Sequence, residues 1–475
     1  MGLHRPSYFH RMRSISGSFN RTVVSLALAV SALAAPAASA EKPAPDLKAG
    51  ETAYGQSCAR CHGAAGKGDG VDAKRFYPRP RDFSLGIYKF RSTASYTPPT
   101  DEDLFRTITN GLPGSNMPDW PHLDERTRWQ LVYYLKSLSP LFQQTGSTPV
   151  QIADDPGPTR ADLAKGKAIY QKLGCAACHG TLGRANGTSA GGLVDDWGMP
   201  IRPANLTQGW AYRGGRDPRS ITLRFLTGID GSGMPSYAEA ITPEETWHLA
   251  YYVASLQEPS NWNMIAHPLA VDGALPSTFD DPRWAAAERT DVRLRNVVSP
   301  GGEWAAPPTV KAVTFQAVSN ADGIAFRISW DDPTEDAQTP PDGLALLLKP
   351  AGSQGDVVTL QAWPYTGAPR LDLCYWAADA PQAAEALADD FDTIAGRGAP
   401  QAMLKSVAGY TEGRWHLVIQ RPLSPADPAG AAEITPEKFT SIAFAVWDGG
   451  NPAARAVSPW VELSLRQPLR STKER

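Results

Sequence analysis

Two hydrophobic patterns divide the chain. In its first half, two segments place apolar residues at helical spacing and read almost alike, at 129–138 and 247–256. From about residue 275 onward, apolar and polar residues alternate in short runs separated by Gly, Pro and Asp, which is typical of strands. These runs lie at 313–317, 324–330, 415–420, 442–447 and 460–465. The pattern predicts a multidomain protein, with all-α domains first and an antiparallel β-sandwich after them.

The helical half is an internal repeat built around two pentapeptides. Residues 58–62 read Cys-Ala-Arg-Cys-His, and residues 175–179 read Cys-Ala-Ala-Cys-His. In this signature two cysteines form thioethers with a haem c, and the histidine binds the iron on the proximal side. A single such motif also fits a zinc site or a redox dithiol, but two copies in register favour haem. The predicted anchors are Cys58, Cys61, Cys175 and Cys178, and the predicted proximal ligands are His62 and His179.

A methionine follows each histidine at the same distance. Met117 lies 55 residues after His62, Met234 lies 55 residues after His179, and each precedes a proline in a glycine-containing loop. A thioether is a soft, neutral ligand that raises the potential of a haem iron, and six-coordinate iron has no open position for substrate. We therefore expect Met117 and Met234 to be the distal ligands. Met199, which also precedes a proline, competes with Met234, but the first copy has no methionine in its place.

Each copy follows one plan: a short helix, the haem motif, a proline-rich loop, the methionine loop and a closing helix. Thr242 and Glu245 predict a capping box at the start of the second closing helix. The plan resembles class I cytochromes c over residues 47–140 and 160–257, which implies two cytochrome c domains with one haem c each. We expect residues 141–159, which are rich in proline, to be a linker.

The first 40 residues have the features of a secretory signal peptide. Four arginines and no acidic residue precede an apolar run at 23–30, and residues 38–40, Ala-Ser-Ala, resemble a cleavage site. The alternative is an uncleaved membrane anchor, but the run is shorter than the ~20 residues of a span. We therefore expect export to the periplasm and no membrane span after cleavage.

Charge argues against nucleic acid as a partner. The chain has 46 basic and 49 acidic residues, and without the arginines of the leader it has 42 against 49. No basic excess remains to neutralise phosphates.

The other cysteine and histidines have simpler interpretations. Cys374 is the only cysteine outside the haem motifs, and its strand-like surroundings predict a buried core thiol. His122 and His248 are expected to pack or to lie at the surface rather than to bind metal. Arg202 and Arg213 lie in loops that either face haem propionates or are solvated.

The C-terminal segment, 272–468, resembles a second family. The motifs that carry the likeness are Asp281-Pro282-Arg283-Trp284, Trp330-Asp331-Asp332-Pro333, Gly413-Arg414-Trp415 and Trp447-Asp448-Gly449-Gly450. They look like the haem-b-binding gamma subunit of ethylbenzene dehydrogenase and its relatives. The resemblance implies a sandwich fold and, as partner, a periplasmic molybdenum enzyme of the dimethyl sulfoxide reductase family.

Members of that family hold a haem b between a methionine and a lysine. The methionine is expected before the strand at 375–376, where this chain has Trp-Pro-Tyr-Thr-Gly at 363–367. Lys405 is the candidate lysine, with Met403 nearby. Two alternatives stay open: a sandwich that binds one haem b, and a structural or docking sandwich without haem.

These features predict a periplasmic multi-haem c-type cytochrome that transfers single electrons and is not itself an enzyme. It would act as a carrier or as the electron-transfer subunit of a molybdenum oxidoreductase complex. One alternative is a haem enzyme, a peroxidase or an oxidase of a small inorganic anion, with one open iron site. Another is a binding module that uses its sandwich to hold polysaccharide or a membrane complex; sugar binding would require Trp363, Trp376 and Trp415 to be exposed.

Overall fold

The chain is described here by a computed structural model. The described residues are 42–466 except 77, 196–197, 297–308, 339, 351–370, 389–393, 397–403, 425–430 and 452–454. The leader at 1–40, the segment 363–367 and Met403 lie outside them. Pro43–Arg475 form one compact unit. No helix among the described residues has the length and apolarity needed to cross a membrane.

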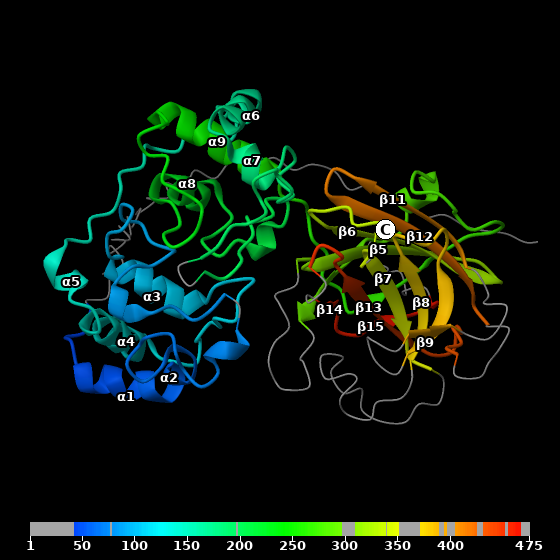
Figure 1. Ribbon diagram of the computed structural model, residues 1–475, viewed down its shortest axis with the longest axis horizontal. Coiled ribbons are helices and arrows are strands. Elements are labelled where there is room, and N and C mark those ends of the chain that lie inside the picture. The colour runs from blue at the N-terminus through cyan, green and yellow to red at the C-terminus, as the bar shows by residue number, and fades with distance from the viewer. Residues whose placement is uncertain are drawn as a thin grey trace, which may run out of the picture. The chain divides into compact units, whose positions relative to one another are not determined.

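The helices repeat in two sets (Figure 1). The first set consists of α1 Leu47–Ser57, α2 Ala59–His62, α3 Asp101–Asn110 and α4 Glu125–Ser137. The second set consists of α6 Leu163–Lys172, α7 Cys175–His179, α8 Pro218–Thr227 and α9 Pro243–Ser255. A short helix, α5 Leu141–Gln144, lies between the sets, and single 3-10 turns occur at Ala73–Arg75, Phe83–Leu85, Gly209–Ala211 and Pro282–Ala285.

Side chains at the first turns fix where the helices begin. The predicted capping box is present at α9, where Thr242 accepts from the Glu245 N–H and Glu245 accepts from the Thr242 N–H. A second capping box, Thr100 with Asp103, starts α3. These caps satisfy amide groups that a helix otherwise leaves without partners.

A glycine lets the first and last helices of each set cross closely. A Cβ atom on Gly50 of α1 would lie 2.4 Å from the Gln130 carbonyl oxygen of α4. A Cβ atom on Gly166 of α6 would lie 2.2 Å from the His248 carbonyl oxygen of α9. Only a residue without a side chain allows backbones to approach this closely. The crossing is therefore the same in both copies.

The C-terminal part consists of two β-sheets. One sheet has the order β1-β15-β13-β7-β8-β9-β10, with β14 and β4 attached to it, and the other has the order β11-β12-β6-β5-β2, with β3 attached to β5. The strands of the first sheet are β1 Ile265–Ala266, β4 Arg295–Asn296, β7 Gly343–Leu348, β8 Leu371–Ala377, β9 Ala384–Ala388, β10 Ile394–Gly396, β13 Thr440–Trp447, β14 Arg455–Val457 and β15 Val461–Leu463. Those of the second sheet are β2 Leu269–Ala270, β3 Thr290–Arg293, β5 Ala312–Ser319, β6 Gly323–Asp331, β11 Lys405–Thr411 and β12 Arg414–Pro422.

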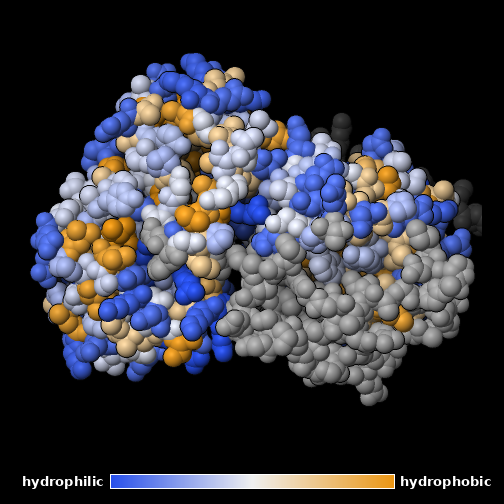
Figure 2. All heavy atoms as spheres, viewed as in Figure 1, coloured by the Kyte–Doolittle hydropathy of each residue, from blue (hydrophilic) through white to orange (hydrophobic). Residues whose placement is uncertain are grey.

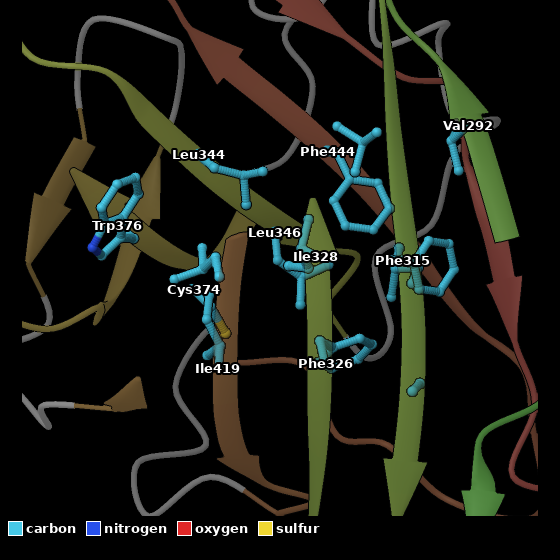
Figure 3. Close-up of a cluster of buried hydrophobic side chains, with 14 of the residues drawn as sticks. Val292, Phe315, Phe326, Ile328, Leu344, Leu346, Cys374, Trp376, Ile419 and Phe444 are labelled. Carbon is cyan, nitrogen blue, oxygen red and sulfur yellow. The ribbon is translucent and has the colours of Figure 1, made fainter. Parts of the chain in front are cut away.

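The two sheets share one hydrophobic core. Phe315 of β5 and Phe444 of β13 meet with ring centroids 5.0 Å apart, and Ile328 and Leu346 fill the space beside them (Figure 3). Cys374 is fully buried in this core and pairs with no other cysteine, which confirms the predicted core thiol. The alternation seen in the sequence arises because one face of each sheet is buried.

The fold departs from the predicted sandwich in one respect. The sandwich is not wholly antiparallel, because the two short strands β1 and β2 pair in parallel with β15 and β5. Residues of the segment 141–159 bond to both helical sets: Val150 N–H donates to the Ser92 carbonyl, and Trp247 Nε1–H donates to the Ala153 carbonyl. Two-residue strands and backbone contacts of this kind have too little periodicity to be read from sequence.

Candidate haem sites

The first candidate proximal ligand, His62, is the last residue of α2. Its Nδ1 atom lies 3.0 Å from the Arg81 carbonyl oxygen, and its ring stacks on Phe83 with centroids 4.3 Å apart. Burial lowers the pKa of His62, which favours the neutral imidazole. With Nδ1–H donating to a carbonyl, Nε2 carries the lone pair that an iron would take.

The second candidate proximal ligand, His179, repeats this arrangement at the end of α7. Its Nδ1 atom lies 2.8 Å from the Ala204 carbonyl oxygen, and burial lowers its pKa. Both carbonyls precede the same small turn. In one copy the Asp82 carboxylate accepts from the Ser84 N–H, and in the other the Asn205 side-chain oxygen accepts from the Thr207 N–H.

A buried tyrosine holds each Cys-x-x-Cys-His turn from behind. The Tyr54 hydroxyl donates to the Gly63 carbonyl at 2.7 Å, and the Tyr170 hydroxyl donates to the Gly180 carbonyl at 2.7 Å. The two glycines have φ angles of +80° and +78°, where a side chain is strained. Each turn is therefore closed by the residue directly after its histidine.

The four motif cysteines are free thiols that are half-buried. Burial raises the pKa of the Cys58 thiol to about 12 and that of the Cys175 thiol to about 11. Neither motif closes into a disulfide. All four sulfur atoms are thus available for thioether bonds.

The two methionine loops have the same backbone bonds. Leu112 N–H donates to the Met117 carbonyl at 3.0 Å, and Ile229 N–H donates to the Met234 carbonyl at 3.0 Å. Both methionine side chains are half-buried, and Met234 packs against the same cluster as Cys175. Met199 lies in a separate turn, where its N–H donates to the Asp195 carboxylate.

Each helical set contributes an arginine to the methionine loop of the other. Arg91, from the first set, is fully buried and forms a 2.7 Å ion pair with Asp230, which lies in the loop that carries Met234. Arg91 also donates to the Thr227 carbonyl. In the opposite direction, the Arg213 guanidinium donates to the Gly114 carbonyl in the loop that carries Met117. The two copies therefore depend on one another structurally.

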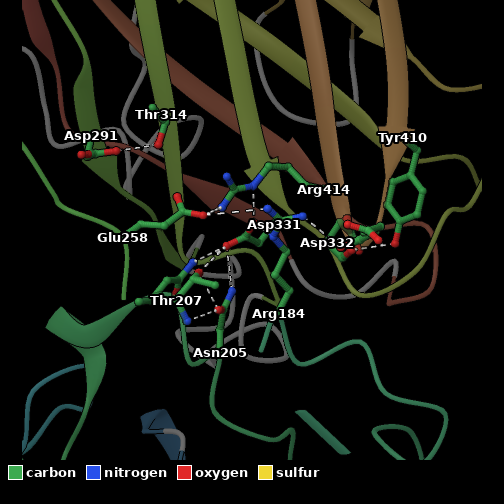
Figure 4. Close-up of polar contacts among 12 residues, drawn as sticks. Arg184, Asn205, Thr207, Glu258, Asp291, Thr314, Asp331, Asp332, Tyr410 and Arg414 are labelled. Carbon is green, nitrogen blue, oxygen red and sulfur yellow. Dashed lines mark hydrogen bonds and ion pairs between the residues drawn. The ribbon is translucent and has the colours of Figure 1, made fainter. Parts of the chain in front are cut away.

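The second proximal loop is bonded to the sandwich (Figure 4). The Asn205 amide donates to the Asp331 carboxylate at 2.7 Å, and Asp331 in turn accepts from Arg414 at 2.6 Å. Glu258, at the end of the second helical set, lies 2.9 Å from Arg414 and 3.9 Å from Arg184. Two acids and two arginines thus join the turn that supports His179 to strands β6 and β12.

The sequence analysis did not identify several of these residues, although the sequence contains a pattern that marks some of them. The segments 79–84 and 202–207 both read Arg-Pro-x-Asp/Asn, then an apolar residue, then Ser/Thr. This repeated pattern marks both carbonyls that accept from the proximal histidines. The pair Arg91 and Asp230 has no such signal, because it joins positions far apart in sequence.

The other residues named as candidates are either packed inside the protein or exposed at its surface. His248 is buried in α9, where its Nδ1 accepts from the Asp162 N–H, and His122 is exposed. Arg202 is exposed. Trp376 and Trp415 are buried in the sandwich core, so they offer no aromatic face to a polysaccharide; Trp363 lies outside the described residues.

The described residues of the sandwich do not fit a haem b. Lys405 is exposed at the start of β11, which is an edge strand of its sheet. The core between the sheets is filled by side chains such as Trp330, Trp376 and Trp415, which pack on one another with centroid distances of 5.0 to 6.2 Å. We therefore give haem b no role in the proposed electron transfer.

The helical residues do fit a covalently bound haem c in each copy. Each has two free thiols, an imidazole whose Nδ1 is held by a carbonyl, and a half-buried methionine in a loop of matching structure. This is the donor set of a c-type haem site.

Both helical segments match a known cytochrome family. Residues 45–135 and 161–253 each match the family Cytochrome C oxidase, cbb3-type, subunit III. The chain is 26% identical over 223 residues to a cbb3-type cytochrome c oxidase subunit CcoP of Azospirillum, with coverage of 44% of this chain and 62% of that protein. It is 29% identical over 163 residues to the subunit FixP of Sinorhizobium medicae, with coverage of 31% and 53%. The chain thus spans less than two thirds of either relative.

Among solved structures, a chain of the Kuenenia stuttgartiensis reducing HAO-like protein complex Kustc0457/Kustc0458 is 42% identical. The likeness covers 46% of this chain and 100% of that one, with a TM-score of 0.44. A family 9 carbohydrate-binding module from Caldicellulosiruptor kristjanssonii is 11% identical with a TM-score of 0.27, which is too weak a likeness to argue from. The two matched segments, 45–135 and 161–253, thus resemble the cytochrome c domains of subunit III of cbb3-type oxidases, and together they make up less than half of the chain.

Proposed function

We propose that the protein is a periplasmic di-haem cytochrome that passes single electrons, as a carrier or as the electron-transfer subunit of a redox complex. The observation that carries this proposal is the repeated arrangement of a carbonyl-held imidazole and a methionine loop, once around His62 and once around His179. Haem c supplies one-electron redox chemistry when bound. The cysteines of each motif would anchor it, and His62, Met117, His179 and Met234 would be the axial ligands.

The chain's own residues then have defined tasks. Arg81 and Ala204 hold the imidazoles in one tautomer through their carbonyl oxygens. Arg91, by its buried ion pair with Asp230, keeps the second methionine loop in place from the neighbouring domain. A site in which both axial positions are filled by protein has no position for substrate, which favours transfer of electrons over catalysis.

The sandwich is proposed to be the part that joins a larger complex. Its motifs resemble a subunit of molybdenum enzymes, so an enzyme of the dimethyl sulfoxide reductase family is the partner that this resemblance favours. The leader supports delivery to the periplasm. On the face in Figure 2, hydrophobic side chains form patches among hydrophilic ones on the helical domains, a mixture that suits transient docking.

The axial ligands are testable by spectroscopy. Met117→Ala and Met234→Ala should each abolish one sulfur-to-iron charge-transfer band and lower the potential of one haem, because a soft neutral ligand is lost. Optical redox titration of the purified protein, with haem stoichiometry by mass spectrometry, measures both effects.

Two other methionines provide matched controls. Met264 is exposed, and Met199 lies in a turn of its own, so their alanine variants should leave both bands and both potentials unchanged. Loss of a band in Met199→Ala with none in Met234→Ala would reassign the second ligand. A haem that is high-spin and binds cyanide in the unmodified protein would contradict the proposal and favour an enzyme with an open iron.

A further inference from the structure

Several buried carboxylates among the described residues lie against a basic side chain. Asp331 lies 2.6 Å from Arg414, Asp372 lies 3.3 Å from Arg421, and Asp291 lies 3.0 Å from Arg289. This is expected, because an uncompensated charge is costly inside a protein. Three other buried carboxylates depart from it.

Asp332, Asp342 and Asp448 meet at one end of the sandwich. Asp332 follows β6, Asp342 precedes β7, and Asp448 follows β13. Strands β7 and β13 pair so that Gly343 is opposite Trp447, which places Asp342 and Asp448 at the same sheet end. One oxygen from each of the three carboxylates lies within 4.8 Å of the others. Their exposed fractions are 0%, 0% and 3%.

Hydrogen bonds satisfy only part of this cluster. Asp342 accepts from the Asp336 N–H, the Gly449 N–H and the Trp415 indole. The Oδ2 atoms of Asp332 and Asp448 are buried and have no hydrogen-bond partner. Asp336, which is not one of the three, adds another buried Oδ2 atom without a partner.

No basic side chain of the described part of the chain balances these charges. Among the residues that the structure describes, no lysine, arginine or histidine lies within ion-pair distance of the three carboxylates. The backbone of Asp332 is fixed by the Tyr410 hydroxyl, which donates to its carbonyl at 2.9 Å (Figure 4). The oxygens are thus held together by the fold and not by attraction to one another.

We propose that Asp332, Asp342 and Asp448 bind a calcium ion that links the ends of β6, β7 and β13. Calcium takes six to eight oxygen ligands at about 2.3–2.6 Å, so two of its ligands lie at most about 5 Å apart, and the observed spread fits. Structural zinc sites are built mainly from cysteine sulfur and histidine nitrogen, whereas this cluster offers oxygen atoms.

The unpartnered oxygens agree with this assignment. A buried carboxylate oxygen without a partner is costly inside a protein, and a divalent cation bound here would offset that cost. The inference does not depend on electron transfer, because the ion would lie wholly within the sandwich.

The test is calcium binding by the full-length protein with its haems. After removal of calcium with EGTA and desalting, isothermal titration with CaCl₂ should give one site per chain, and calorimetry should show an unfolding midpoint that rises with CaCl₂ concentration. MgCl₂ at the same concentrations should have a much smaller effect, because magnesium demands a stricter octahedral geometry. An equal response to both ions, or no binding, would overturn the calcium site.

Two variants decide whether the three carboxylates are responsible. Asp448→Asn keeps the oxygen that accepts from Asn451 and removes charge. It should abolish calcium binding and, in EGTA, raise the unfolding midpoint above that of the natural chain. With calcium present, its midpoint should instead be lower than that of the natural chain. Loss of a purely structural hydrogen bond would lower the midpoint in both conditions. Asp332→Asn is the second variant, should the first fail to fold. Asp291 is a buried carboxylate paired with Arg289, so Asp291→Asn should keep the calcium response. Loss of the calcium response in Asp291→Asn would refute the assignment. A calcium response that persists in Asp448→Asn would refute it as well.

Discussion

Asn205 donates a 2.7 Å hydrogen bond from its amide to the carboxylate of Asp331, so a turn of the second cytochrome domain is bonded to a strand of the sandwich. The Ala204 carbonyl just before it accepts from His179. In the first domain Asp82 occupies the same position in the turn. The second domain, which is bonded to the sandwich, therefore has an amide at the position where the first domain has a carboxylate.

Replacing that amide tests the connection. Asn205→Asp reproduces the residue of the first domain and places a second carboxylate against Asp331, so we expect a loss of about 1–3 kcal/mol in unfolding free energy. We also expect the potential of the second haem to shift, because its proximal turn is displaced. Denaturant unfolding and redox titration measure the two effects.

Asp82→Asn is the matched control, because Asp82 accepts only within its own turn among the contacts described. It should change stability and potential little. Equal effects of the two variants would mean that the sandwich does not act through Asn205.

The buried pair Arg91 and Asp230 should be the strongest single link between the cytochrome domains. Arg91→Met leaves a carboxylate buried without its partner, and we expect a loss of about 3–5 kcal/mol, measured by guanidinium unfolding. The double variant with Asp230→Asn should recover part of that loss. If Arg91→Met costs no more than an exposed pair such as Lys48 with Glu51, the link is not structural.

The helix crossings predict that a Gly→Ala substitution destabilises the protein at two glycines and stabilises it at a third. Gly50→Ala and Gly166→Ala each force a Cβ atom against a backbone oxygen of the partner helix, so each should destabilise its own domain by about 1–3 kcal/mol. Gly55 also lies in α1 but has open space around it, so Gly55→Ala should stabilise by up to about 1 kcal/mol. Thermal unfolding of the three variants decides; destabilisation by Gly55→Ala would refute this explanation.

Without calcium, the acidic cluster should make the sandwich less stable as pH rises. The native pKa of Asp342 is raised to about 6, above its ordinary value near 4. The native state therefore keeps a proton that the unfolded chain releases, so this contribution is complete below about pH 4 and is lost as pH rises through about 6.

The same interval contains an opposing contribution from His416. Burial and the nearby Arg414 lower its pKa to about 4, so its contribution is present above about pH 6.5 and is lost as pH falls. Urea unfolding in EGTA at several pH values therefore compares the natural chain with Asp342→Asn. The difference between the two curves should favour the natural chain increasingly toward low pH; a constant difference would contradict the raised pKa.

The sequence determined the features that depend on neighbouring residues. Cys-x-x-Cys-His, the equal spacing of Met117 and Met234, the capping box at Thr242 and the alternation of the strands are all local or periodic. They predicted two helical cytochrome domains, a sandwich after them and a candidate ligand set. The axial ligands stay predictions until spectroscopy tests them.

Only the tertiary structure decided how distant residues meet. The ion pair of Arg91 with Asp230, the bond of Asn205 to Asp331 and the acidic cluster at the ends of β6, β7 and β13 each join segments with no shared periodicity. Burial, which sets whether a carboxylate needs an arginine or a metal ion, depends on how the whole chain packs. No local pattern carries that information.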